Sequence, residues 1–115
     1  MKNELTATQK TLSALGLCAK ARGLIVGTPM ICEALKNRKK EVFSVLCASD
    51  NSNNTAKRLA DRCAYYGVRL EALDADGDML GKAVGKSGRV AAVAVTDENL
   101  WRMVEKALRK DNAQS

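Results

Sequence analysis

Apolar residues follow two alternating patterns along this chain. The helical spacing of Leu12, Leu15 and Ala19 predicts an amphipathic helix over residues 5–19. The short apolar or alternating stretches that follow are typical of β-strands, and the continuous ones are typical of strands buried on both faces. They predict strands at residues 24–26, 42–48, 68–73 and 89–96. A segment with helical spacing follows each strand, and the last two helices are expected over residues 79–84 and 97–108.

Local signals predict the ends of these helices. Thr28 is the expected N-cap of the second helix, with Pro29 at its first position, and Thr96 is the expected cap of the last helix. The second helix should end in the basic run 36–40, and Gly67 should end the third. The apolar face of the third helix is expected to consist of Ala56, Leu59, Ala60 and Cys63.

The order of these elements predicts the fold class. One helix followed by four strand–helix pairs indicates an α/β domain with helices on both faces of one sheet. Such units favour parallel neighbouring strands joined by right-handed crossovers. With 115 residues, the chain is expected to form a single domain over 1–115, with 109–115 as a frayed tail.

The charge balance favours a polyanionic partner. Lys and Arg number 19 against 13 Asp and Glu, which gives a net charge of +6. Such an excess promotes binding through counterion release, and it fits RNA, DNA or an acidic membrane surface equally. A basic protein without any such partner remains an alternative on charge alone.

Several chemistries lack the residues that they need. The chain has no His, and its four Cys form no CxxC pair, so we expect no enzyme, no cofactor and no metal site. No apolar run approaches about 20 residues, so no membrane span is expected. Unpaired thiols favour a reducing compartment and hence a cytoplasmic protein, and a monomer is favoured.

Glycines and cations near residue 85 resemble a nucleotide-binding loop only superficially. Between Gly81 and Gly85 there are three residues where a P-loop needs four, and the segment ends a helix instead of following a strand. We instead interpret Lys86, Ser87, Gly88 and Arg89 as a loop whose N–H groups and cations contact phosphate. An ordinary surface turn is the alternative.

Two further segments are candidates for phosphate binding. Gly27 and Thr28 precede a helix, whose N-terminus offers free N–H donors and the positive end of the dipole. Lys36 and Arg38 belong to the basic run 36–40, which would support binding if it lay beside the other sites. A solvated helix end is the alternative explanation for that run.

Seven blocks of sequence, in order, resemble the L7Ae-type ribosomal proteins, and most closely their small bacterial YlxQ-like members. The blocks are residues 15–22, 26–28, 46–50, 53–55, 61–66, 80–86 and 93–97. The resemblance implies a three-layer α/β/α sandwich with a mixed four-stranded sheet. It also implies binding to kink-turns in ribosomal or other structured RNA, as part of a ribonucleoprotein. In this family the start of the second helix and the loop before the last strand form one RNA-binding surface.

Three positions depart from the family pattern. Kink-turn binders carry Asn and Glu directly after Gly-Thr, and a Lys three residues later, where this chain has Pro29, Met30 and Glu33. Pro and Met supply no side-chain hydrogen bonds to bases, and Glu33 repels phosphate, whereas phosphate contacts elsewhere are retained. The alternative is that this altered site docks a protein partner, because Met suits adaptable protein contacts. A third hypothesis, a substrate-presenting part of an RNA-modifying enzyme, also leaves this chain without catalysis.

Overall fold

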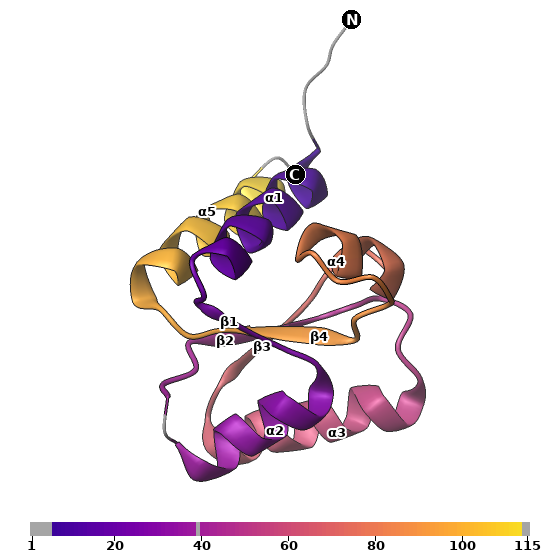
Figure 1. Ribbon diagram of the computed structural model, residues 1–115, viewed down its shortest axis with the longest axis vertical. Helices are drawn as coiled ribbons and strands as arrows, with labels where there is room; N and C mark the ends of the chain where they lie inside the picture. The colour runs from indigo at the N-terminus through magenta and orange to yellow at the C-terminus, as the bar shows by residue number, and fades with distance from the viewer. Residues whose placement is uncertain (1–5, 39, 114–115) are drawn as a thin grey trace, which may run out of the picture.

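The sheet divides the protein into three layers. The computed structural model describes residues 6–38 and 40–113, and within these residues helices and strands alternate (Figure 1). The elements are α1 (Ala7–Lys20), β1 (Leu24–Val26), α2 (Thr28–Asn37), β2 (Ser44–Cys47), α3 (Asn53–Tyr66), β3 (Arg69–Ala72), α4 (Gly77–Ala83), β4 (Ala92–Val95) and α5 (Glu98–Ala113). Helices α1, α4 and α5 cover one face of the sheet, and α2 and α3 cover the other. The predicted three-layer α/β/α arrangement is confirmed.

The sheet is mixed, with strand order β1-β4-β2-β3. Strand β4 runs antiparallel to both of its neighbours, β1 and β2, and only β2 and β3 are parallel neighbours. The mixed four-stranded sheet implied by the family resemblance is therefore correct. The expectation of parallel neighbours throughout is wrong, because β4 is inserted between β1 and β2, which would otherwise pair.

Alternation along β4 supplies both faces of the core. Val93 and Val95 are fully buried against α1, α4 and α5, together with Leu46 of β2. Ala92 and Ala94 face α2 and α3, where Val45 and Leu59 are fully buried. The small alanines on this side let the two helices approach the sheet closely.

Two of the predicted helix caps are wrong by one residue. Helix α2 begins at Thr28 itself and its N-cap is Gly27, so Pro29 occupies the second position of the helix. Asp97 caps α5 in place of Thr96, because its Oδ1 accepts a hydrogen bond from the N–H of Leu100 at 2.9 Å. The predicted end of α3 is confirmed, since Gly67 takes the left-handed conformation there with φ of 69°.

Other boundaries differ by a few residues. Helix α1 begins after a capping box between Thr6 and Gln9; residue 5, the predicted start, lies outside the described residues. Strands β2 and β4 are shorter than 42–48 and 89–96, because their outer residues turn into loops. Helix α5 continues through residue 113, into the segment expected to be a frayed tail. None of the described helices combines the length and apolar character needed to span a membrane.

Helix α3 buries a narrower face than its sequence suggests. Leu59 and Cys63 are buried as predicted, whereas Ala56 and Ala60 are exposed. Alanine is a favourable helix residue on either face, so its presence does not mark the core. The buried stripe of α3 therefore follows the larger side chains.

Leu59→Ala is expected to lower the free energy of unfolding by about 2–5 kcal/mol, because it leaves a cavity under the sheet. Urea denaturation followed by circular dichroism measures this change. Ala60→Gln, on the exposed side of the same helix, should change the free energy by less than about 0.5 kcal/mol. Equal losses for the two variants would contradict the orientation of α3.

Candidate nucleic-acid interface

The start of α2 and the loop after α4 lie side by side because of one strand pairing. Strands β1 and β4 are antiparallel, with Val26 opposite Val93, so the end of β1 meets the beginning of β4. The N–H of Gly27 donates to the carbonyl oxygen of Ala92 at 2.9 Å, which extends the pairing to the helix cap. Residues 85–91, which lead into β4, therefore reach the N-terminus of α2.

These two segments enclose an open groove of about 430 Å³. Its lining combines six of the eight residues expected to contact RNA with four neighbours that were not among those eight. The expected residues are Gly27, Thr28, Lys86, Ser87, Gly88 and Arg89, and the neighbours are Val26, Pro29, Val90 and Ala91. Two candidate segments about 60 residues apart in the sequence thus form one site.

The helix side of the groove offers backbone donors. Gly27 has φ of 99° and caps α2 without a side-chain hydrogen bond. Pro29 has no N–H, so the first turn presents the N–H groups of Thr28 and Met30, which have no acceptor within the helix. The positive end of the helix dipole adds to their attraction for an anion.

Thr28 is buried at the base of this groove. Among the described residues, its hydroxyl Oγ1 finds no hydrogen-bond partner. A buried hydroxyl without a partner is costly to the folded state. The hydroxyl is thus a polar group close to the donors of the first turn.

The loop side begins with a sharp reversal after α4. The N–H of Gly85 donates to Lys82 O at 3.3 Å, and that of Lys86 donates to Gly81 O at 2.9 Å. This pair of backbone hydrogen bonds is a Schellman motif. The motif requires the left-handed conformation that Gly85 adopts, with φ of 79°. The turn leaves Lys86 exposed, with no ion-pair partner among the residues that the structure describes.

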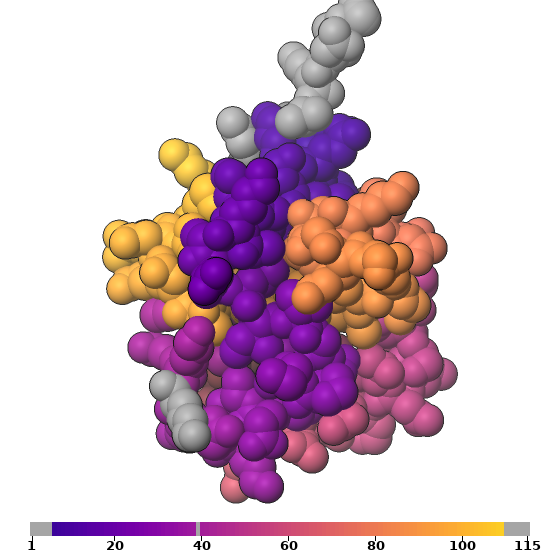
Figure 2. All heavy atoms as spheres, in the orientation of Figure 1, coloured from indigo at the N-terminus to yellow at the C-terminus, as the bar shows by residue number. Residues whose placement is uncertain are grey.

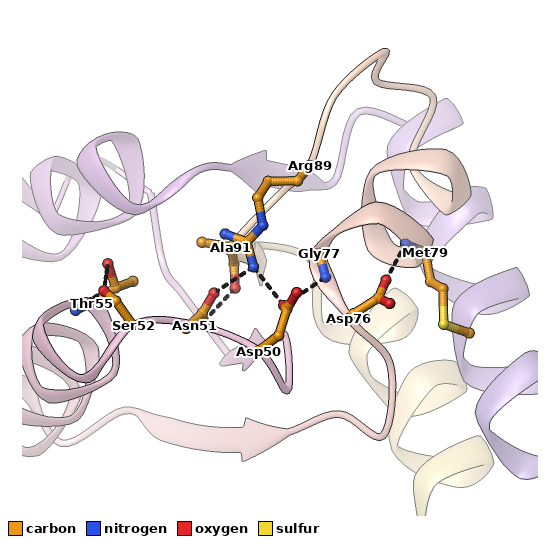
Figure 3. Close-up of polar contacts among 9 residues, drawn as sticks. All are labelled: Asp50, Asn51, Ser52, Thr55, Asp76, Gly77, Met79, Arg89 and Ala91. Atoms are coloured by element: carbon orange, nitrogen blue, oxygen red, sulfur yellow. Dashed lines mark hydrogen bonds and ion pairs between the residues drawn. The ribbon is translucent and has the colours of Figure 1, made fainter.

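Arg89 is held by a polar segment from another part of the chain (Figure 3). Its guanidinium contacts Oδ1 of Asp50 at 2.5 Å and Oδ1 of Asn51 at 3.3 Å. Asp50 also accepts a hydrogen bond from the N–H of Gly77 at 2.9 Å, at the start of α4. The loop itself contains no acid, and the carboxylate that pairs with Arg89 comes from the connection between β2 and α3.

The same contacts determine the charge of Asp50. The hydrogen bond from the Gly77 N–H lowers the pKa of this carboxyl below its ordinary value, and Arg89 lowers it further. At neutral pH Asp50 is therefore ionised and offsets much of the charge of Arg89. Lys86 is left as the cation of the groove whose charge is not offset by a nearby acid.

Two glycines allow α4 to pack against this loop. A Cβ on Gly77 would lie 2.6 Å from Nε of Arg89, and a Cβ on Gly81 would lie 2.0 Å from the carbonyl oxygen of Gly88. Any larger residue at Gly81 would push the backbone of the loop away. Gly81 also lies inside α4, so its surroundings differ from those of a P-loop glycine.

Lys36 and Arg38 are not brought into the groove. Lys36 lies eight residues after Thr28 on α2, which places it about 12 Å further along the helix axis. The guanidinium carbon of Arg38 lies 5.6 Å from the ring centre of Tyr66, in a cation–π contact with the end of α3. Lys39, of the same basic run, lies outside the described residues.

Three of the four cysteine thiols are poorly suited to nucleophilic chemistry. Burial raises the pKa of Cys18 and of Cys63 to about 11, and it also raises the pKa of Cys47. Thiols with such values are protonated at neutral pH and react slowly. Within the described residues, no group of three or more potential ligands is placed to hold a metal ion.

Sequence comparison identifies relatives over most of the chain. The model of the ribosomal protein L7Ae/L30e/S12e/Gadd45 family matches residues 9–105. The RNA-binding protein YlxQ of Bacillus subtilis (strain 168) is 37% identical over 84 residues, covering 73% of this chain and 80% of that protein. The RNA-binding protein YlxQ of Enterococcus faecium is 29% identical over 85 residues, covering 74% and 80% of the two chains.

Solved structures share the same arrangement of elements. A protein of unknown function from Bacillus halodurans is 32% identical, with a TM-score of 0.77 over 87% of this chain and 97% of that one. The 15.5kD RNA binding protein of Giardia lamblia is 20% identical, with a TM-score of 0.75 over 100% and 94% of the two chains. At that identity the second likeness supports the fold alone.

Asp50→Asn is expected to reduce stability at pH 7, because it removes the charge that Gly77 and Arg89 stabilise. The pKa of Asp50 is lowered in the folded state, so its contribution is present at neutral pH. This contribution is lost as the pH falls from about 4, the pKa of an unfolded Asp, through the lower pKa that Asp50 has in the folded protein. Urea midpoints of the two proteins, measured from pH 7 to pH 2.5 or to the lowest pH at which both still fold, should converge as the pH falls.

Asp61→Asn provides the matched control. It removes a carboxylate from an exposed pair with Lys57 on α3, and such pairs contribute little. If the difference in urea midpoint between Asp50→Asn and the natural protein stays constant with pH, the role of the charge is contradicted.

Proposed function

Because the chain belongs to the ribosomal protein L7Ae/L30e/S12e/Gadd45 family, we propose that it binds structured RNA and catalyses no reaction. The binding site is the groove between the start of α2 and residues 86–89. One observation carries the proposal: the N–H groups of the first turn of α2 and Lys86, which has no ion-pair partner among residues 6–38 and 40–113, line a single groove. The relatives in Bacillus subtilis and Enterococcus faecium are named RNA-binding proteins, which supports RNA as the ligand.

The groove suits a phosphate backbone better than a base edge. Backbone N–H groups, a helix N-terminus and a lysine are all typical phosphate contacts, and they fix position without reading sequence. The groove is open on one side, and a bent RNA would place phosphates against both of its walls. Recognition by shape is the general mode for structured RNA.

We propose a kink-turn, or a comparably bent element of ribosomal RNA, as the ligand. A kinked backbone would place one strand against the N-terminus of α2 and the other against Lys86. Pro29 and Met30 offer no side-chain donors or acceptors for base edges, so discrimination would come from the bend. Exposed Glu33 is hydrogen-bonded to Asn37 at 3.1 Å, on the solvent side of α2.

Lys36 and Arg38 would contact only an RNA that extends along α2. Their distance from the groove means that a short kinked element does not reach them, whereas a longer stem would. The four thiols are free, which fits the proposed reducing, cytoplasmic location.

Lys86→Gln is expected to weaken binding to a kink-turn RNA several-fold, because it removes one phosphate contact. The slope of log affinity against log salt concentration should fall in magnitude by about 1. Titration of labelled kink-turn RNA and of an unbent duplex of equal length, at several salt concentrations, measures both effects. The natural protein should prefer the bent RNA.

Lys106→Gln serves as the control, since Lys106 is exposed on α5, away from the groove. It should change neither the affinity nor the salt slope by a comparable amount. Equal binding to bent and unbent RNA would reduce the function to a basic surface. Equal effects of the two lysine variants would place the RNA elsewhere.

Met30 favours a second candidate function, the docking of a protein at the same site. Its side chain is 61% exposed beside the groove, and a flexible thioether adapts to the protein surface that it meets. This candidate predicts no binding to either RNA in the titration above. It also predicts that Met30→Ser abolishes association with the protein partner, whereas in an RNA-binding site the same variant should be nearly neutral.

A further inference from the structure

A second, larger groove lies on the other side of α4, between α4 and α1. It has a volume of about 880 Å³ and opens on the face shown in Figure 2, between the indigo α1 and the orange α4. The two helices touch at its floor, where a Cβ on Gly16 would lie 2.7 Å from the carbonyl oxygen of Ala83. Gly16 thus permits a close approach of α1 to Ala83, the last residue of α4.

The walls of this groove are apolar and exposed. Leu17 is 52% exposed and Met79 is 43% exposed, and they project from the two opposing helices. The other apolar lining residues are Leu12, Ala19, Ala83 and Val84. Within the described residues only four large apolar side chains are classed as exposed, so the presence of two of them in one groove marks it as an interaction surface.

The rim of the groove is positively charged. Lys20 on α1 and Lys82 on α4 line it, and its twelve lining residues include no acid. Neither lysine has an ion-pair partner in the part of the chain that the structure describes. A ligand that fills the groove would therefore meet an apolar floor between two free cations.

We infer that this groove docks an acidic amphipathic helix of a protein partner. The apolar walls would take leucine-like side chains, and Lys20 and Lys82 would pair with flanking carboxylates. A phosphate backbone finds too few donors on this floor to occupy it. Met79 suits such a contact because its flexible thioether adapts to the side chains it meets.

The walls also determine the secondary structure of the ligand. Both walls are helices whose backbone groups are bonded internally, so the groove presents no strand edge for a peptide to extend. The docked segment must satisfy its own backbone hydrogen bonds, which a helix does. From Gln9 to Lys20 the α1 wall rises about 17 Å, which matches a helix of about three turns.

The two grooves adjoin without overlapping in their lining. Gly85 lines the apolar groove and Lys86 lines the proposed RNA groove, on the two sides of one turn. The inference does not rest on RNA binding, and it holds whichever ligand occupies the other groove. A protein helix and an RNA are expected to bind together.

Selection from a displayed library of random helical peptides of about 16 residues, long enough for four turns, tests the chemistry of the ligand directly. Peptides enriched on the full chain should carry apolar residues at helical spacing flanked by Glu and Asp. Fluorescence anisotropy then measures the affinity of an enriched peptide. Amide chemical shifts of the labelled protein locate it, and the shifts should concentrate on α1 and α4.

Two variants probe the groove independently. Leu17→Ser removes an apolar wall residue that is already half exposed, and the double variant Lys20→Glu/Lys82→Glu reverses the charge of the rim. Each is expected to weaken the enriched peptide at least tenfold. The double variant Arg62→Glu/Lys106→Glu changes the net charge equally at two exposed positions outside the groove, and it should weaken binding less than threefold.

Several outcomes would overturn the inference. One is the enrichment of basic peptides, or of no peptide at all. Another is a set of amide chemical-shift changes centred on Gly27 and Lys86. A third is a loss of peptide affinity in the control variant equal to that in the groove variants. Sedimentation showing a dimer that Leu17→Ser dissociates would assign the groove to a second copy of this chain. Displacement of the peptide by RNA would assign it to the nucleic acid instead.

Discussion

The antiparallel pairing of β1 with β4 is the constraint on which the rest of the structure depends. Three residue pairs define its register, and the N–H of Gly27 extends it by donating to Ala92. A slip of one residue would turn Val93 and Val95 from one core to the other and exchange them with alanines. The difference in size between these side chains therefore opposes any slip. The register that fills the two cores also places the start of α2 beside the loop after α4.

Strand β4 also pairs with β2, and this pairing places the segment after β2 beside the loop that precedes β4. Cys47 lies opposite Ala92, and the N–H of Ala48 donates to Ala91 at 2.9 Å. The chain that leaves β2 therefore passes the beginning of β4, where Asp50 contacts Arg89 and Gly77. Arg89 holds the loop, whereas Lys86 on the same loop pairs with no acid in the part of the chain that the structure describes. Two cations three residues apart thus have different roles, which their sequence alone does not distinguish.

Local sequence signals predicted most elements because helical spacing and buried strands depend on neighbouring residues. They failed at the start of α2, where the N-cap residue has no capping side chain. Gly27 caps the helix through its backbone conformation, so the adjacent Thr28 was mistaken for the cap. They also failed at Ala60, because alanine is compatible with both faces of a helix. The mixed sheet came from the family resemblance, since the alternation of strands and helices favoured parallel neighbours.

The candidate site was predictable in its parts and less so in its contacts. The capacity of Gly27, Thr28 and Lys86 to meet phosphate follows from residue type, and the resemblance implied that their segments meet. Lys36 and Arg38 were selected on charge, and they lie at the far end of the ten-residue helix α2 from the groove. The contact between Arg89 and Asp50 joins residues 39 apart in the sequence, and Asp50 lies in a stretch whose composition is typical of any polar turn. No local signal distinguishes such a residue.

Helix α4 connects the two surfaces of the molecule, and its ends show how their relation is maintained. At its start, Asp76 caps the helix through the N–H of Met79, and Asp50 accepts from Gly77. At its end, the chain turns so that Gly85 lines the apolar groove and Lys86 lines the proposed RNA groove. A helix of seven residues is too short to be stable alone, so its position depends on these contacts and on Leu80 in the core. Asp50 lines neither groove, yet it holds both the start of α4 and the loop after it. The geometry of both surfaces therefore depends on the network formed by Asp50, Gly77 and Arg89.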